Sequence, residues 1–181
     1  MIVLNYYGGP SVGKSYQAAV SYTLFKKKGY RVELVGEYAK ELIYEQSLVN
    51  IHDQLYLFAE QSHRLRRLAR SGIEIAVCDS PLLLNIIYNQ SEDKDIFDKL
   101  VLNEYNKYRN FNYLIQRNKL FYVGTDRIHG YKESVEKDIE IKGLLEKYKI
   151  DYNDLNWKDE TIPVEDIERV INIDWVRAAH L

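Results

Sequence analysis

The sequence is poor in cysteine and has no long apolar run. Its 181 residues include a single cysteine, Cys78, so no disulfide can form within the chain and no zinc site can be built from thiolates. No apolar stretch approaches the ~20 residues that a membrane-spanning helix needs. The amino terminus has no basic leader before its first glycines. We therefore expect a cytoplasmic protein without a membrane segment.

A strong charge of either sign is also missing. The formal net charge is -2, with 29% charged and 46% hydrophobic residues, which is an ordinary globular composition. This balance argues against a generally basic nucleic-acid-binding protein, although it leaves a local basic patch open. Because there is no repeat and no low-complexity linker, residues 1–181 are expected to form one domain.

What the sequence does contain is a regular alternation of apolar strands with helices. Its patterns predict strands over 2–7, 31–35, 73–79, 113–116 and within 150–156. They predict helices over 14–28, 37–48, 51–71, 82–89, 95–109, 133–149 and 163–176. Alternation of this kind favours an α/β fold in which a five-stranded parallel sheet is flanked by helices. The helical insertion 37–72, between the second and third strands, is a candidate for binding an acceptor.

A glycine-rich loop follows the first predicted strand. Residues 8–15, Gly-Gly-Pro-Ser-Val-Gly-Lys-Ser, match the pattern GxxxxGK[ST] between a strand and a helix, which is typical of a P-loop. Its backbone N–H groups and the positive end of the helix can hold a polyphosphate. Lys14 is expected to reach the β- and γ-phosphates of ATP, and the Ser15 hydroxyl to ligate Mg²⁺. The predicted ATP-binding residues of this loop are Gly8, Gly9, Pro10, Ser11, Val12, Gly13, Lys14 and Ser15.

A carboxylate, Asp79, ends the third predicted strand. In P-loop proteins a carboxylate at this position helps to organise Mg²⁺. The next residue is Ser80, whereas ATP-driven motors commonly need a water-activating acid there, so the sequence disfavours a motor. A turn residue paired with Ser80 is the alternative role of Asp79.

A second carboxylate, Glu37, follows the second predicted strand. Ligands enter such folds at the carboxyl ends of the strands, so Glu37 is the leading candidate for the base that accepts the proton of an acceptor hydroxyl. An acid in the first turn of a helix, favourable to the helix dipole, is the alternative role. Glu41 lies one helical turn further on and is the alternative carboxylate.

Two arginines are candidates for stabilising the transferred phosphoryl group. Arg117 follows the fourth predicted strand, and Arg127 lies in the polar segment 118–132, which we interpret as a lid. For both residues an ordinary solvated loop arginine is the alternative. Arg64 and Arg67 can bind a phosphate if their helix lines the acceptor cleft, and a solvated helix face is the alternative there.

Four segments together resemble the NadR-like P-loop kinase family, which includes ribosylnicotinamide kinase domains. They are the phosphate loop, Glu-Tyr-Ala-Lys-Glu-Leu-Ile at 37–43, Asp-Gln-Leu-Tyr-Leu-Phe-Ala-Glu-Gln at 53–61 and Cys-Asp-Ser at 78–80. The resemblance covers most of the chain and implies a strand order of 2-3-1-4-5, use of ATP and Mg²⁺, and a nucleoside-like acceptor. In the family's pattern Glu37 and Asp79 match the acids after the second and third strands, and Arg127 falls in the lid-like segment.

Loop and resemblance together predict an ATP- and Mg²⁺-dependent kinase. Its acceptor is a hydroxyl of a nucleoside, nucleotide or related small molecule, with ribosylnicotinamide as one candidate. Two alternatives stay open. One is a kinase of a modified base or an end in DNA, which the charge makes secondary. The other is a regulatory module that binds ATP and changes shape without transferring phosphate.

Overall fold

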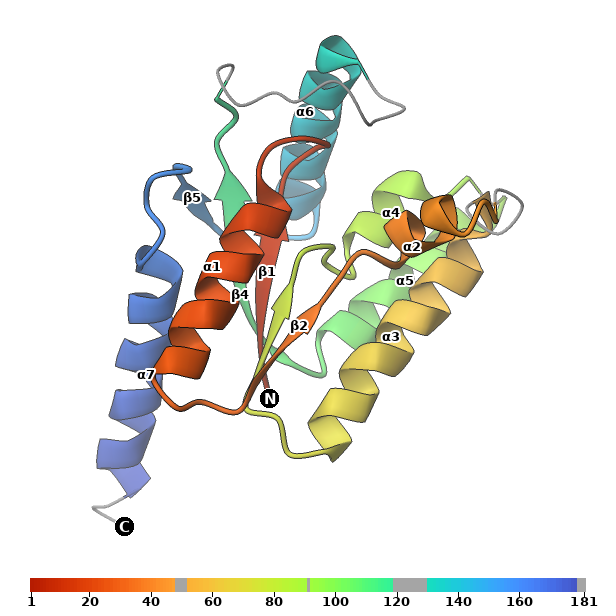
Figure 1. Cartoon of the computed structure of the whole chain (residues 1–181). Coiled ribbons are helices and arrows are strands. Elements are labelled where there is room, and N and C mark those ends of the chain that lie inside the picture. The colour runs from red at the N-terminus through yellow and green to blue at the C-terminus, as the bar shows by residue number, and fades with distance from the viewer. Residues whose placement is uncertain (48–51, 91, 119–129, 179–181) are drawn as a thin grey trace.

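The computed structural model describes residues 1–47, 52–90, 92–118 and 130–178, with side chains as far as residue 172. A parallel sheet lies between two layers of helices (Figure 1). The strands are β1 (Ile2–Tyr7), β2 (Val32–Val35), β3 (Ile75–Cys78), β4 (Arg109–Ile115) and β5 (Asn153–Leu155). The helices are α1 (Lys14–Lys27), α2 (Tyr38–Tyr44), α3 (Gln54–Arg70), α4 (Leu84–Tyr88), α5 (Lys94–Tyr105), α6 (Tyr131–Lys147) and α7 (Ile162–Ala178).

The five strands stand in the order β2-β3-β1-β4-β5, which confirms the expected fold class and strand order. Every neighbouring pair is parallel. The carboxyl ends of all the strands therefore meet at one edge of the sheet, which is where ligands bind in folds of this kind. The loop after β1 and the residues after β2, β3 and β4 are brought together at this edge.

The central strand β1 shows why the sheet is covered on both faces. Leu4 and Tyr6 pack in a cluster with α1 and α7, whereas Val3 and Tyr7 pack in a second cluster with α3, α4, α5 and α6. Successive side chains of a strand point to opposite faces. A run of apolar and aromatic residues interrupted only by Asn5 is therefore the pattern of a strand that is buried on both sides.

The chain between α5 and β4 differs from the sequence prediction. The helix expected over 95–109 is wrong at its end, because β4 already begins at Arg109. Polar residues on one face of β4 hid the strand pattern. Asn5 on β1 donates from Nδ2 to the Oδ1 atoms of Asn110 and Asn112, each at 3.0 Å. The amides satisfy one another across neighbouring strands, so they can lie inside the protein.

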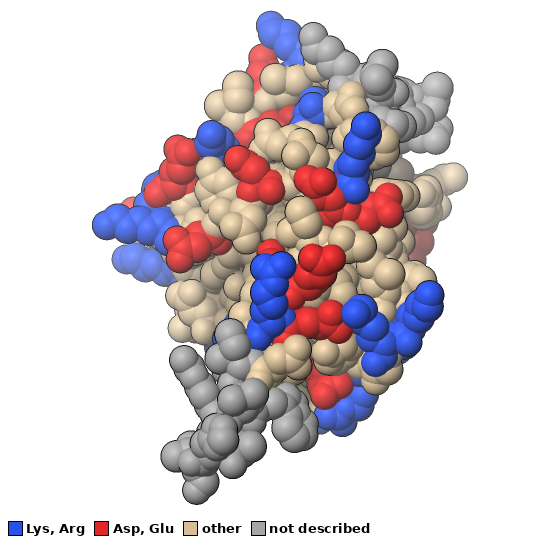
Figure 2. Space-filling view, turned by 90° about the vertical axis from the view of Figure 1, so that its left-hand side faces the viewer, with Lys and Arg blue, Asp and Glu red and all other residues tan. Residues whose placement is uncertain are grey.

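The side of the molecule formed by α1 and α7 carries charges of both signs. Figure 2 shows its basic and acidic side chains interspersed, without a continuous basic surface. Lys28 pairs with Glu168 at 2.9 Å, and Arg169 pairs with Asp166 at 3.1 Å. Among the described helices, none is long and apolar enough to cross a membrane.

Candidate active site

The loop between β1 and α1 has the backbone that the glycine pattern predicts. Gly8 and Gly13 have φ angles of 143° and 102°, in the region that favours glycine. A Cβ on Gly8 would lie 2.6 Å from Cγ1 of Val12, so the loop is too tight there for any side chain. Gly13 is the N-cap of α1 and has no side chain to occupy the first N–H groups of the helix. No capping side chain of Gly13 therefore competes there with an anion.

Lys14 and Ser15 open α1 beside this loop. The Lys14 ammonium donates to the carbonyl oxygens of Gly8 at 2.8 Å and Gly9 at 3.1 Å. The lysine side chain is thus held against the backbone of the loop. Ser15 is exposed in the first helical turn.

Asp79 follows β3 directly and is buried. Its backbone N–H donates to Val35 O at 3.3 Å. Its Oδ1 atom is buried and has no hydrogen-bond partner among the described residues, which is costly for a carboxylate unless a ligand completes the site. Mg²⁺ in kinase sites is held by one or two protein oxygens together with phosphates and water. Asp79 and the Ser15 hydroxyl fit such an ion.

Glu37 lies after β2 as the N-cap of α2, and its side chain makes no capping hydrogen bond. Its carboxylate therefore caps no N–H group of α2, whereas its position at the start of the helix is one that the helix dipole favours for an acid. Burial, followed by the negative charges of Glu37, Glu140 and Asp138, raises the pKa of Tyr88 on α4 to about 12. Glu37 therefore lies within electrostatic range of Tyr88 on α4, as Glu140 and Asp138 on α6 do.

Glu41, the alternative carboxylate, is bound on both of its oxygens. Arg64 on α3 donates from Nη1 and Nη2 to Glu41 Oε1 and Oε2, each at 2.7 Å, and from Nε to Glu60 Oε1 at 2.9 Å. The Arg64 guanidinium also lies over the Tyr38 ring, 4.7 Å from its centroid. Arg64 therefore links α2 to α3, and its positive charge is paired with the carboxylates of Glu41 and Glu60.

Arg67 lines a surface hollow of about 440 Å³ on α3, together with His63, Arg66 and Arg70. Arg64 is not in the lining of this hollow, and its guanidinium is held by Glu41 and Glu60.

The Arg64 pair makes a prediction about acid stability. Hydrogen bonds from Arg64 lower the pKa of Glu41. A lowered pKa stabilises the folded protein above the unfolded value of ~4.3, and this contribution is lost as the pH falls through the folded value. Glu41→Gln should cost roughly 0.5–1 kcal/mol of unfolding free energy near pH 7, because the pair is partly exposed. Urea unfolding measured from pH 7 to 3 should show that the difference in unfolding free energy between the wild type and Glu41→Gln narrows below about pH 5.

Glu45→Gln is the matched control for this measurement, because Glu45 is an exposed acid at the C-cap of the same helix. A gap between Glu41→Gln and the wild type that does not change with pH would contradict the prediction.

Arg117 is placed where β4 ends, as expected, but its contacts are with protein groups. Its Nε lies 2.5 Å from Asp138 Oδ2, and its Nη2 lies 2.9 Å from Pro10 O. The sequence reasoning missed Asp138, because an acid among the many charged residues of α6 carries no local signal. Arg127 lies outside the described residues, as do residues 119–129 of the expected lid.

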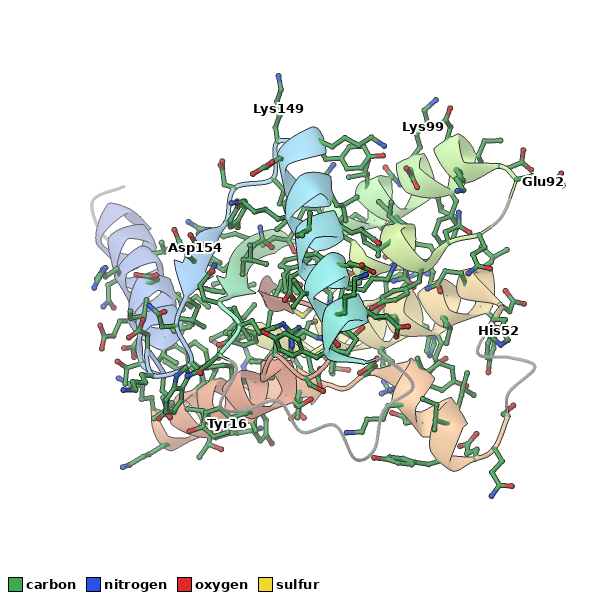
Figure 3. The ribbon with its side chains drawn as sticks, turned by 90° about the horizontal axis from the view of Figure 1, so that it is seen from above. Tyr16, His52, Glu92, Lys99, Lys149 and Asp154 are labelled. Atoms are coloured by element: carbon green, nitrogen blue, oxygen red, sulfur yellow. The ribbon has the colours of Figure 1, made fainter. Side chains whose placement is uncertain are left out.

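A hollow of about 610 Å³ has Arg117 in its lining, together with Gln116, Asn118, Asn156 and Trp157. The carbonyl of Trp157 accepts a hydrogen bond from Gln17 on α1 at 2.8 Å, which ties this rim to the helix that follows the phosphate loop. Seen from above, α6 crosses the molecule between the α7 side and the α4 and α5 side, with α1 and Tyr16 below it in the view (Figure 3). The sequence reasoning did not identify Trp157.

A parallel sheet in this strand order, with a GxxxxGKS loop between β1 and α1, defines a P-loop nucleotide-binding protein. The family is identified by a sequence model. Residues 3–161 match the model of the AAA domain (AAA_28), and the chain belongs to this P-loop NTPase family.

Two solved structures of deoxyadenosine kinase from M. mycoides are similar to the chain. The one with products dCMP and a flexible dCDP bound has a TM-score of 0.53 at 17% identity, covering 95% of this chain and 99% of that one. The one with bound dCTP has a TM-score of 0.53 at 16% identity, covering 94% and 98%. At this identity the likeness shows the fold. None of the curated protein sequences matches.

Proposed function

We propose that this protein is an ATP-dependent phosphotransferase that acts on a hydroxyl of a nucleoside-like small molecule. The observation that carries the proposal is the contrast between two carboxylates after β2. Arg64 holds both oxygens of Glu41, whereas the Glu37 side chain makes no capping bond at the edge of the sheet that carries the phosphate loop. A carboxylate at this position suits a general base. The likeness in fold to a deoxyadenosine kinase supports including deoxynucleosides among the candidate acceptors.

In the proposed reaction the acceptor hydroxyl attacks the γ-phosphorus of ATP. A bond forms between the acceptor oxygen and this phosphorus, the bond to the β–γ bridging oxygen breaks, and ADP leaves. The Glu37 carboxylate takes the proton of the hydroxyl. Lys14 and the N–H groups at the start of α1 stabilise the negative charge on the transferred group. Mg²⁺, held by Ser15 and Asp79, would neutralise charge on the phosphate oxygens.

The base of ATP and the acceptor are assigned to two further parts of the molecule. We place the base of ATP in the hollow that Trp157 and Gln116 line, because Arg117, which also lines it, contacts Pro10 of the phosphate loop. The acceptor is placed towards α2 and α3, within the insertion 37–72. Segment 118–132, with Arg127, is proposed to close over the phosphates as a lid.

The experiment that tests the function is transfer of label from γ-labelled ATP to a panel of acceptors. The panel contains ribosylnicotinamide, deoxynucleosides, nucleotides and hydroxymethylated DNA. We expect labelling of at least one nucleoside, with a salt-insensitive rate. Labelling of DNA alone would favour the nucleic-acid kinase. Tight binding of Mg-ATP without any labelled acceptor would favour the regulatory module.

The proposed metal site predicts the behaviour of Asp79→Asn. Removing the negative charge should raise the Mg²⁺ concentration that gives half-maximal transfer by about tenfold, because a neutral amide oxygen attracts the cation less than the carboxylate does. Transfer rates measured across a Mg²⁺ titration check this, with Asp95→Asn on α5 as an exposed control. An unchanged Mg²⁺ dependence would contradict a metal role for Asp79.

A further inference from the structure

The phosphate loop is held by a helix that follows it by more than a hundred residues. The N–H group of Gly9, the second residue of the loop, donates to Oδ1 of Asp138 on α6 at 2.6 Å. This donor is therefore taken by a carboxylate of the protein. A hydrogen bond to an ionised acceptor is stronger than one between neutral groups.

Arg117 joins the same carboxylate to the next residue of the loop. Its guanidinium lies 2.5 Å (Nε) and 3.1 Å (Nη2) from the two oxygens of Asp138. The same Nη2 donates to Pro10 O at 2.9 Å and to Ser134 O at 3.3 Å. Only 9% of the Arg117 side chain is exposed. One arginine thus connects the end of β4, the phosphate loop and α6.

The fit at Gly9 supports the same arrangement independently. A Cβ built on Gly9 would lie 2.5 Å from Ser134 O, 3.0 Å from Asp138 Oδ1 and 3.1 Å from Arg117 Nη2. The first of these atoms belongs to the backbone of α6, which cannot rotate away as a side chain can. The loop and α6 are therefore in direct contact, with no room for a side chain between them.

Because of these contacts, the Arg117 guanidinium is poorly placed to bind a nucleotide. Its positive charge is met by Asp138, and the remaining atom, Nη1, is buried without a partner among the described residues. Because solvent does not reach Nη1, a phosphate could meet it only if the loop moved.

We infer that Arg117 and Asp138 are positioning residues that hold Gly9 and Pro10 in the nucleotide-binding conformation, and that Arg117 is not itself a phosphate ligand. The inference rests on the ATP binding of the proposed function and replaces the role that the sequence predicted for Arg117. The two side chains act as one unit, because each keeps the other in place. Removing either should therefore have the effect of removing both.

The test is a double-mutant cycle of Arg117→Ala and Asp138→Ala, with the dissociation constants of ATP and ADP measured by calorimetry. Each single variant should weaken both nucleotides by about tenfold, the effect of losing a charge-assisted hydrogen bond that orders the loop. The double variant should bind no more weakly than the weaker single variant. The ratio of ATP to ADP affinity should stay at its wild-type value.

Direct binding of a phosphate by Arg117 would give another pattern and would overturn the inference. Asp138→Ala would then leave the ATP affinity unchanged or raise it, since the guanidinium would lose a competing carboxylate. Arg117→Ala alone would weaken binding. Unchanged affinities in both single variants would also overturn it.

Controls separate positioning from general instability. Glu136→Gln removes a more exposed carboxylate from the same helix and should bind both nucleotides as the wild type does. Melting temperatures are measured for each variant. If the alanine variants do not fold, Asp138→Asn replaces them, because its amide oxygen still accepts from Gly9 while the charge opposite Arg117 is lost. Asp138→Asn should then weaken the affinities for ATP and ADP equally, and by less than the tenfold expected of the alanine variants. Unchanged binding would overturn the inference.

The readout needs no acceptor, so it is distinct from the test of the proposed function. If the wild type binds both nucleotides but labels no acceptor, the proposed function is wrong, and the cycle still decides the role of Arg117.

Discussion

Lys14→Ala is expected to reduce phosphoryl transfer by about 10²–10³-fold, the loss seen when one fixed donor to a developing charge is removed. The Lys14 ammonium donates to the carbonyls of Gly8 and Gly9, in the loop that is proposed to wrap the phosphates. An alanine leaves that position without a positive charge, and the backbone N–H groups cannot supply one. Transfer of labelled phosphate and calorimetric ATP binding measure the two consequences separately.

Lys27→Ala provides the matched control for Lys14, because Lys27 is an exposed lysine in the last turn of the same helix. It removes an identical charge at the far end of α1 and should leave transfer unchanged. A Lys14→Ala protein with wild-type ATP affinity and wild-type transfer would rule out the nucleotide site at this loop.

Glu37→Gln is expected to lower the transfer rate by about 10²–10⁴-fold, the usual contribution of a general base, while ATP affinity stays within about twofold. The amide has nearly the shape of the carboxylate, so α2 should still begin at Tyr38. It cannot accept the proton of the acceptor hydroxyl. The variant therefore separates nucleotide binding from chemistry, measured by ATP calorimetry and by single-turnover transfer.

Two neighbouring acids make this result specific. Glu45→Gln removes an exposed charge from the C-cap of α2 and should not change the rate. Glu41→Gln weakens the contact between α2 and α3 and should cost at most about tenfold, since its carboxylate is held by Arg64. Loss of transfer in Glu41→Gln with full transfer in Glu37→Gln would assign the base to Glu41.

Local patterns predicted those parts of the site that lie on one continuous segment. The apolar run before Gly8, the glycines and Lys14 are neighbours in the chain, and the structure gives them the strand, loop and helix that the pattern requires. Asp79 could be found because a buried strand precedes it. The strand order came from resemblance to a family, and the structure confirms it.

Contacts between distant segments had no such signal. Whether Glu37 or Glu41 is the better base depends on Arg64, which is more than twenty residues away and holds only one of them. The β4 strand was misread because the polar face of its asparagines is satisfied by Asn5 on a neighbouring strand.

The sequence by itself determined that this chain carries a phosphate loop at the edge of a parallel sheet, because glycine conformation, helix dipole and strand burial are properties of adjacent residues. Only the tertiary structure decided what surrounds that loop. In the fold, the Asp138 carboxylate accepts a hydrogen bond from the Gly9 N–H group and forms an ion pair with Arg117. The sequence does not show this, because a charged side chain pairs with whichever group the fold brings within hydrogen-bond distance.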